Sequence, residues 1–274
     1  MTPILMDITI GMDPNLFSIG NLVLTWHGFF TFVSVAVALF LVARWAKTEG
    51  IITDVIYSVA VWAIIGGLVG ARAVHVIDRW DFYGDNVGNI VQIWSGGIAI
   101  YGAVLGGFVA GALYAMWKKH PIGRIADIAA PGVILAMAIG RIGDLINGEH
   151  FATRTELPWG VVYTHPQTLS LYASADTNAL LPTHPATTYE MLFDIAVLGL
   201  LWPLRGRLRP DGMIFALFLA LYSVGRFFIS FLRLDKEWLF GLNQAQLIAI
   251  IVLAITVPLL IYKAQFSIKV KADD

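Results

Sequence analysis

The sequence predicts an all-α protein that spans a membrane seven times. Hydrophobic residues make up 58% of the 274 positions and charged residues only 14%, whereas a soluble domain carries roughly a quarter of charged residues. The apolar residues are also gathered into runs of about 20, and a helix of that length crosses the roughly 30 Å of hydrocarbon in a bilayer. A polytopic membrane protein explains both observations.

Seven apolar runs give the predicted spans, and most are joined by short linkers. The spans cover residues 22–46, 55–77, 97–117, 125–147, 187–204, 212–233 and 242–262. The one long connection, residues 148–186, is rich in polar and aromatic residues, so we expect an ordered insertion outside the membrane. Residues 1–274 are expected to form a single membrane domain that includes this insertion.

The distribution of Lys and Arg predicts the orientation of the chain. Eleven of the 18 basic residues fall at one end of the spans: Arg44, Lys47, Lys118, Lys119, Arg124, Arg205, Arg207, Arg209, Lys263, Lys269 and Lys271. Basic loops stay in the cytoplasm. We therefore expect an external N-terminus, a cytoplasmic C-terminus and an extracytoplasmic insertion.

Composition also limits the chemistry. The chain has no cysteine, which excludes disulfides, a cysteine-ligated metal and a cysteine nucleophile of its own. A net charge of −1 argues against nucleic acid as a partner. No His-Glu-x-x-His motif occurs, so we expect no metal site. Asp7 and Asp13 precede the first span without any basic residue, and we expect that span itself to direct insertion.

Glycines recur four residues apart in two neighbouring spans. Gly66 and Gly70 lie in the second span, and Gly102 and Gly106 lie in the third. Small residues at this spacing let helix backbones approach closely in a membrane. We interpret them as helix-packing positions.

Ionisable residues near one end of several spans indicate a functional site. They are Arg72, Arg141, Asp144, Glu149, Glu190, Asp194 and Arg226. Charged groups at such depth are costly unless they are paired or hydrated, so by default they mark a site. Arg141 and Asp144 are three residues apart and could pair on one helix face. Arg233 lies close enough to the interface to reach water.

Three arginines predict an anion-binding site. Arg72, Arg141 and Arg226 all lie toward the outer leaflet in the predicted orientation, with Asn147 near Arg141. A guanidinium group binds phosphate in a planar, bidentate way. A phospholipid head group is the anion that this leaflet offers, so we expect an anionic lipid as ligand.

Two further residues are candidates for proton transfer. His27, in "LTWHGFF", could accept a proton, although a single membrane histidine also serves as a hydrogen-bond partner between helices. Tyr101 follows a Ser-Gly-Gly break and begins the third span among glycines that leave room for a ligand.

Six stretches of the chain carry a resemblance to a known family. They are "GARAVHVIDRWDFY" (70–83), "IWSGGIAIYGAVLGG" (93–107), "GRIGDLINGE" (140–149), "PWGVVY" (158–163), "HPATTYE" (184–190) and "SVGRFFISFLR" (223–233). On these residues the chain resembles the prolipoprotein diacylglyceryl transferases of the bacterial inner (plasma) membrane. Residues 140–149 are similar to the family signature Gly-Arg-x-Gly-Asn-Phe-x-Asn-x-Glu.

The resemblance implies a reaction and the residues that perform it. The family transfers the diacylglyceryl group of phosphatidylglycerol to the thiol of a lipobox cysteine in a prolipoprotein, releases glycerol phosphate, and needs no cofactor. Arg141 and Arg226 match the family's essential arginines, which we assign to the phosphate. The expected substrate-binding set is Arg141, Asp144, Asn147, Glu149, Glu190 and Arg72.

The sequence departs from the family pattern at several positions. Tyr101 stands where many members have a catalytic histidine, and His27 stands where a tyrosine is usual. Either residue could therefore accept the thiol proton, and both belong to the expected catalytic set. Asp144 replaces the signature asparagine and adds a negative charge beside Arg141. Leu145 replaces the signature phenylalanine, Ala152 stands where the family signature closes with a glycine, and Ser230 occupies a position often held by glutamate.

Three other functions are weaker alternatives. The departures favour a diverged member that binds lipid or lipoprotein without turnover, but Arg141 and Arg226 are both present. A transporter would suit intramembrane charges, although these gather toward one leaflet rather than at the midplane. A retinal-type seven-helix receptor requires a lysine inside the last span, and residues 242–262 contain none.

Overall fold

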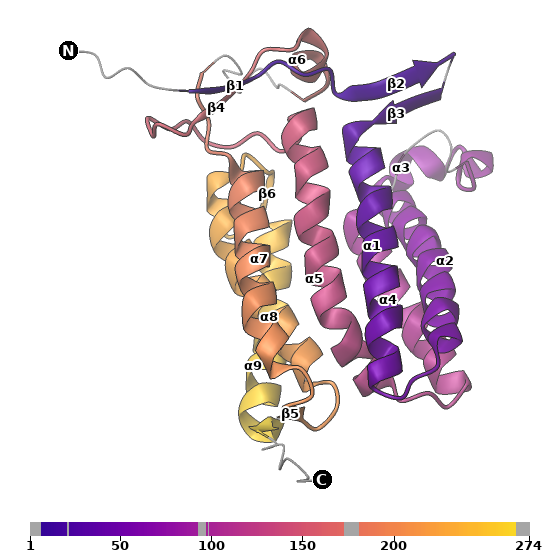
Figure 1. Cartoon of the computed structure of the whole chain (residues 1–274). Helices are drawn as coiled ribbons and strands as arrows, with labels where there is room; N and C mark the ends of the chain where they lie inside the picture. The colour runs from indigo at the N-terminus through magenta and orange to yellow at the C-terminus, as the bar shows by residue number, and fades with distance from the viewer. Residues whose placement is uncertain (1–6, 21, 93–96, 98, 173–180, 267–274) are drawn as a thin grey trace. The chain divides into compact units, whose positions relative to one another are not determined.

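The computed structural model describes residues 7–20, 22–92, 97, 99–172 and 181–266, and it is mainly helical (Figure 1). Seven of the described helical segments are long and apolar enough to span a membrane. They are α1 (Trp26–Thr48), α2 (Thr53–Asp78), α4 (Ile100–Trp117), α5 (Ile122–Asn147), α7 (Ala186–Leu204), α8 (Met213–Ile229, extended by η3, Ser230–Leu232) and α9 (Gln244–Lys263). These segments coincide with the seven predicted spans, so the predicted all-α polytopic membrane fold is confirmed.

The short elements lie between or beside the spans. They are β1 (Ile8–Ile10), β2 (Asn15–Ile19), β3 (Leu22–Thr25), α3 (Trp80–Tyr83), η1 (Val87–Asn89), β4 (Val161–Tyr163), α6 (Pro166–Tyr172), β5 (Leu208–Arg209), β6 (Glu237–Leu239), β7 (Leu242–Asn243) and β8 (Gln265–Phe266). The first span begins at Trp26 instead of residue 22, because residues 22–25 pair with β2 as an antiparallel strand.

The predicted insertion, residues 148–186, has regular structure where it is described. It contains β4 and α6, and β4 pairs in parallel with β1 near the N-terminus. Thr183 exchanges backbone hydrogen bonds with Val161. Residues 173–180 of this segment lie outside the described residues. Its position outside the membrane stays a prediction.

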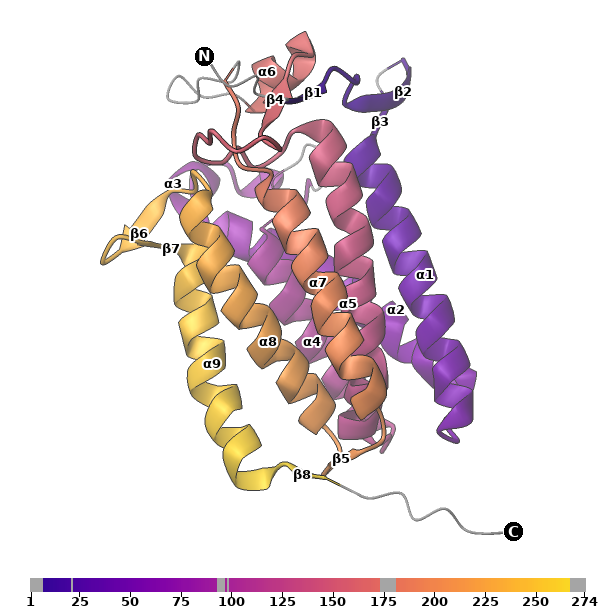
Figure 2. The same cartoon turned by 60° about the vertical axis from the view of Figure 1, so that its left-hand side comes forward.

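The chain forms two compact units. One contains Met1–Ala38 and Ala126–Asp274, and the other contains Leu39–Ile125. In the first unit, α7, α8 and α9 lie side by side in both views (Figures 1 and 2). Its apolar core includes Ile134 of α5, Leu201 of α7 and Ile214 of α8, each at most 1% exposed. Between membrane spans such side chains stabilise the packing through van der Waals contact, since lipid is as apolar as the side chains themselves.

The second unit is built around the closely packed pair α2 and α4. A Cβ atom added to Gly70 of α2 would lie 2.9 Å from Cα of Gly106 in α4, and Gly66 and Gly102 meet the opposite helix in the same way. Backbones at this distance leave no room for a side chain. The predicted packing role of these glycines is confirmed.

Candidate active site

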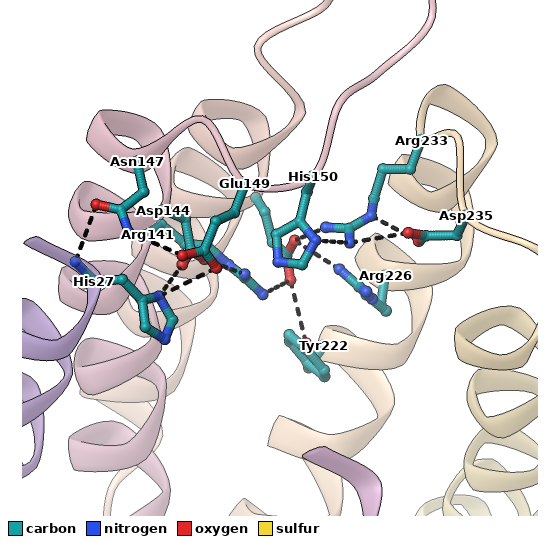
Figure 3. A network of polar contacts seen from close by, with 11 residues as sticks. His27, Arg141, Asp144, Asn147, Glu149, His150, Tyr222, Arg226, Arg233 and Asp235 are labelled. Atoms are coloured by element: carbon teal, nitrogen blue, oxygen red, sulfur yellow. Dashed lines mark hydrogen bonds and ion pairs between the residues drawn. The ribbon is translucent and has the colours of Figure 1, made fainter. Parts of the chain in front are cut away.

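The candidate site lies in the first unit, where four helix ends bring polar side chains together (Figure 3). Helices α1 and α7 begin there, and α5 and α8 end there. His27 is the second residue of α1, Asn147 the last of α5, and Arg226 lies in the last turn of α8. Spans that alternate in direction bring these starts and ends to the same side, which is why His27 and Asp144 meet although 117 positions separate them.

Two glycines allow the helices to come close enough. A Cβ atom on Gly143 of α5 would lie 2.8 Å from Cα of His27 and 2.9 Å from the carbonyl oxygen of Trp26. A Cβ atom on Gly225 of α8 would overlap the ring of Phe193 in α7. The start of α1 therefore lies directly against α5, and α8 directly against α7.

Glu190 is the centre of the cluster. Its side chain is 2% exposed, and it accepts hydrogen bonds from Nη2 of Arg141 at 2.5 Å and from Nη1 of Arg226 at 2.8 Å. The hydroxyl of Tyr222 donates a third bond at 3.2 Å. One buried carboxylate thus orients two guanidinium groups, and such charge-assisted bonds are the strong ones in proteins.

Arg141 has a second carboxylate partner. Its Nη1 donates to Oδ2 of Asp144 at 2.6 Å, so the predicted pairing of these two residues is present. The Nε of Arg141 is buried, and no hydrogen bond from the described residues reaches it. The two acids therefore fix the guanidinium group through its two Nη atoms, and the Nε–H remains as an unused donor.

Asp144 also binds His27. Its Oδ1 lies 2.6 Å from Nδ1 of the imidazole, and Oε2 of Glu149 lies 3.6 Å from the same nitrogen. Asn147 completes the arrangement, because its Oδ1 accepts the backbone N–H of His27 at 3.3 Å and its Nδ2 donates to Oε1 of Glu149 at 3.0 Å. The first helix is thereby tied to the end of α5 by side chain and backbone alike.

The turn after α5 places Glu149. Gly148 has a φ of +75°, in the left-handed region that favours glycine, and its N–H donates to the carbonyl of Asp144 at 3.0 Å. The N–H of Glu149 reaches the same carbonyl at 3.3 Å. This glycine cap ends the helix sharply and turns the following residues back toward the cluster.

The same part of the site offers atoms that a cation could use. One ligand atom each from His27, Asp144 and Glu149 lies within 4.8 Å of the others. Two of these atoms, Nδ1 of His27 and Oδ1 of Asp144, are already joined by the 2.6 Å hydrogen bond, however, so they are bound to each other rather than both turned toward an ion. The arrangement fits a hydrogen-bonded His–Asp pair better than a metal centre.

Arg233 extends the cluster, and the expectation that it reaches water is wrong. Its side chain is 3% exposed. Its Nε donates to Oδ2 of Asp235 at 2.8 Å, and its Nη2 donates to Nδ1 of His150 at 2.6 Å. The Nη1 atom lies 4.0 Å from Glu190. A third arginine therefore faces the same carboxylate as Arg141 and Arg226.

Charge around Arg233 sets the protonation of its neighbours. Packing around the ring and the Arg233 cation lower the pKa of His150 to about 4, so the imidazole is neutral at pH 7 and can accept the bond from Arg233. Although burial acts in the opposite direction, the hydrogen bond from Arg233 lowers the pKa of Asp235. Sequence reasoning missed Tyr222, His150 and Asp235. The sequence offered one signal for Asp235: it lies two residues after Arg233, directly after a span, where the two side chains can pair.

Asp194 lies one helical turn beyond Glu190. It is fully buried at 0% exposure, and neither carboxylate oxygen has a hydrogen-bond partner among the described residues. It was part of the predicted ionisable group, but among the described residues it makes no hydrogen bond to the cluster.

Arg72 and Tyr101 belong to the second unit. Arg72 is buried and donates to the carbonyl oxygens of Asn89 at 2.6 Å, Ile90 at 2.7 Å and Gly97 at 2.8 Å. It therefore holds the connection between α2 and α4. Tyr101 is the second residue of α4, and Ser95 and Gly96 of the break before it lie outside the described residues. A meeting of either side chain with Arg141 stays a prediction.

Comparison with known proteins identifies the family. The model of the family described as "Prolipoprotein diacylglyceryl transferase" matches residues 14–262. A phosphatidylglycerol–prolipoprotein diacylglyceryl transferase of Dehalococcoides mccartyi is 35% identical, with 93% of this chain and 95% of the relative covered. Proteins of the same name from Staphylococcus aureus (33%; 92% and 89%) and Acaryochloris marina (32%; 92% and 90%) are similar over comparable lengths. The chain belongs to the prolipoprotein diacylglyceryl transferase family.

Proposed function

We propose that the arginine cluster around Glu190 binds the phosphate of phosphatidylglycerol while its diacylglyceryl group passes to the thiol of a lipobox cysteine. The transfer of diacylglyceryl from phosphatidylglycerol to a prolipoprotein, a step of lipoprotein maturation, follows from the family and from the names of the relatives. The cysteine thiol as acceptor, glycerol phosphate as product and the residues in their roles are our proposal.

The observation that carries the proposal is the sharing of Glu190 by Arg141 and Arg226. Both guanidinium groups are held by one buried carboxylate, at 2.5 and 2.8 Å, and are thereby oriented before any ligand arrives. Their side chains are 16% and 15% exposed, so they remain open to a ligand at the helix ends. A preorganised pair of guanidinium groups is suited to a phosphate diester.

The same pair would stabilise the departing group. When the sulfur attacks the glyceryl carbon, the bond from that carbon to the phosphate oxygen breaks, and the leaving glycerol phosphate gains negative charge. Fixed cations at that point lower the barrier because they need no reorganisation during the step. Asn147 and Glu149 would orient the head group and the His27 backbone, and Asp144 and Glu190 would orient the arginines.

The proposed site is at the external face of the bacterial inner membrane. The basic residues Lys118 and Lys119 lie between α4 and α5 and Arg124 lies in the first turn of α5, at the opposite end of that helix from Asp144. By the positive-inside rule that opposite end faces the cytoplasm. The cluster would then meet the lipobox of a prolipoprotein on the external side of the membrane.

Two residues remain as proposed acceptors of the thiol proton, Tyr101 and His27. A thiol has a pKa of about 8.5 when unperturbed, and the thiolate is the nucleophile. A base that removes the proton during attack would contribute roughly 10²–10⁴-fold to the rate.

A turnover assay tests the proposal. Purified protein in detergent micelles is given phosphatidylglycerol and a synthetic lipobox peptide, and the peptide mass and glycerol phosphate release are followed. We expect a diacylglyceryl mass increase with the Cys peptide and none with its Ser counterpart. Absence of product, with lipid still bound, would instead indicate a diverged member without turnover.

The arginine role is tested by conservative substitutions. Arg226→Lys keeps the positive charge but removes the planar guanidinium group that can bind phosphate through two N–H donors, so turnover should fall on the order of 100-fold. Arg207→Lys, an exposed arginine in the connection between α7 and α8, is the matched control and should leave turnover unchanged. Both variants are first checked for the elution volume and thermal stability of the wild type. Full turnover by Arg226→Lys would contradict the assignment.

A further inference from the structure

Two of the departures from the family pattern touch each other. His27 stands where a tyrosine is usual and Asp144 where an asparagine is usual, and their side chains are 2.6 Å apart although 117 positions separate them. We propose that His27 accepts the proton of the incoming thiol and that Asp144 is the positioning residue that holds its imidazole ready. This inference rests on the proposed function and assigns the base within it.

The ring is arranged with one nitrogen occupied and the other available. Nδ1 of His27 faces Oδ1 of Asp144, while Nε2 has no hydrogen-bond partner among the described residues. The His27 side chain is 44% exposed, against 5% for Asp144. A substrate can therefore reach the imidazole, whereas the carboxylate that orients it is shielded. Figure 3 shows the two side chains facing each other.

Arg141 determines which tautomer the ring adopts. A guanidinium group only donates, so Oδ2 of Asp144, at 2.6 Å from Nη1 of Arg141, must be an acceptor. The remaining oxygen is also an acceptor and takes the Nδ1–H of His27. The proton of the neutral ring is thus placed on Nδ1, and the lone pair is on Nε2, where a thiol can donate.

This geometry makes the two departures depend on each other. With asparagine at 144, the amide oxygen would face the donating Arg141, and the amide nitrogen would point at Nδ1 of His27. Nδ1 would then have to accept, the ring proton would move to Nε2, and the base would be lost. A histidine at position 27 therefore needs a carboxylate at 144, and this chain has both.

Two of the charged groups that face the ring, Asp144 at 2.6 Å and Glu149 at 3.6 Å, stabilise a transient imidazolium. The Arg141 cation, which lies beyond Asp144 and is paired with it, acts in the opposite direction. In the step itself, Nε2 takes the thiol proton while sulfur bonds to the glyceryl carbon, and the electron pair of the breaking C–O bond leaves with the phosphate oxygen. The imidazolium then returns its proton to the released glycerol phosphate, which restores the neutral ring.

Steady-state kinetics with the Cys peptide test the assignment. We expect His27→Gln to lower kcat by roughly 10²–10⁴-fold with KM changed by less than about threefold, since the arginines that bind the lipid are retained. Asp144→Asn should lower kcat to a similar extent. The same exchange at exposed Asp54 is the matched control and should leave kcat unchanged.

A double variant separates positioning from a merely structural role. If Asp144 acts through His27, then His27→Gln with Asp144→Asn should be no slower than His27→Gln alone, because partners in one network are not additive. Added imidazole should restore part of kcat to His27→Ala but not to His27→Ala with Asp144→Asn. Losses that multiply in the double variant would overturn the positioning role.

Other results bear on the base itself. Turnover that survives His27→Gln would overturn this inference and leave the proposed function intact. Wild-type turnover that is abolished by EDTA and restored by Zn²⁺ would overturn it in favour of a metal held by His27, Asp144 and Glu149. A wild-type protein without any product would overturn the proposed function, and this assignment with it.

Discussion

Glu190 contacts three arginines and a tyrosine of the site. Removing its charge is therefore a direct test of the structure. Glu190→Gln keeps the shape and volume of the residue and removes only its charge. Arg141 and Arg226, bonded to it at 2.5 and 2.8 Å, would then face an amide whose nitrogen cannot accept from either. Arg233 would also lose the counter-charge 4.0 Å from its Nη1.

The expected loss of stability is large. Removing one partner of a buried ion pair costs about 3–5 kcal/mol, because a charge is left uncompensated in a low dielectric. For a protein of this size each kcal/mol lowers Tm by about 2–4 °C. The predicted fall in Tm is therefore roughly 6–20 °C.

Thermal unfolding in detergent micelles measures the fall. Tyr222→Phe removes one neutral donor to the same carboxylate, at 3.2 Å, and should cost only about 1–3 kcal/mol. Glu156→Gln makes the same exchange at an exposed position of the insertion and should stay within about 0.5 kcal/mol of the wild type. The three variants should therefore rank in this order.

Equal Tm values for the three variants would refute the reasoning. If Glu190→Gln unfolds within 2 °C of Glu156→Gln, as about 0.5 kcal/mol would allow, the arginines are not held by this carboxylate. A fall in Tyr222→Phe as large as that in Glu190→Gln would indicate packing, rather than charge, as the source of stability.

Three further predictions follow from other parts of the molecule. The pKa of His150 is about 4 in the folded protein and about 6.5 in the unfolded chain. As the pH drops from 6.5 toward 4, the unfolded chain therefore binds the proton first, and the free energy of unfolding should fall. The fall should be modest because the residue is exposed. Thermal scans of His150→Gln should show a shallower fall, and equal slopes would contradict this. Gly106→Ala should destabilise the α2–α4 pair by about 1–3 kcal/mol. Gly111→Ala should be tolerated in the same thermal scan, because its Cβ would lie 3.4 Å from the Cβ of Ala63, an ordinary van der Waals distance. Arg72→Lys cannot serve three carbonyl oxygens in one plane, so Tm should fall; a raised KM at unchanged Tm would favour the substrate-binding role instead.

The spans could be predicted because hydropathy alone determines them. Each predicted span agrees with a helix to within a few residues. The predicted start of the first span was four residues too early. Val23 and Leu24 are apolar, and hydropathy does not distinguish an apolar strand from an apolar helix. Hairpin pairing with β2, a contact beyond the span itself, decides the boundary.

The site was predictable only where charge stands out against apolar surroundings. Arg141, Glu190 and Arg226 were found in this way. Arg233 was not, because an arginine near the end of a span ordinarily reaches water, and only the fold shows that His150 and Asp235 enclose it. The contact of His27 with Asp144 depends on Gly143, whose missing side chain lets α1 lie on α5. No spacing rule connects residues so far apart in the chain.

The shared position of Asp144 has a consequence for the order of events. A carboxylate that serves both Arg141 and His27 divides its attraction between them. A lipid phosphate that draws Arg141 toward itself would leave Asp144 more fully to the imidazole. His27 would then be ready to accept a proton only after the lipid has bound. A peptide that enters the site before the lipid would not be deprotonated efficiently. We expect strictly sequential kinetics, with phosphatidylglycerol as the leading substrate and the peptide second.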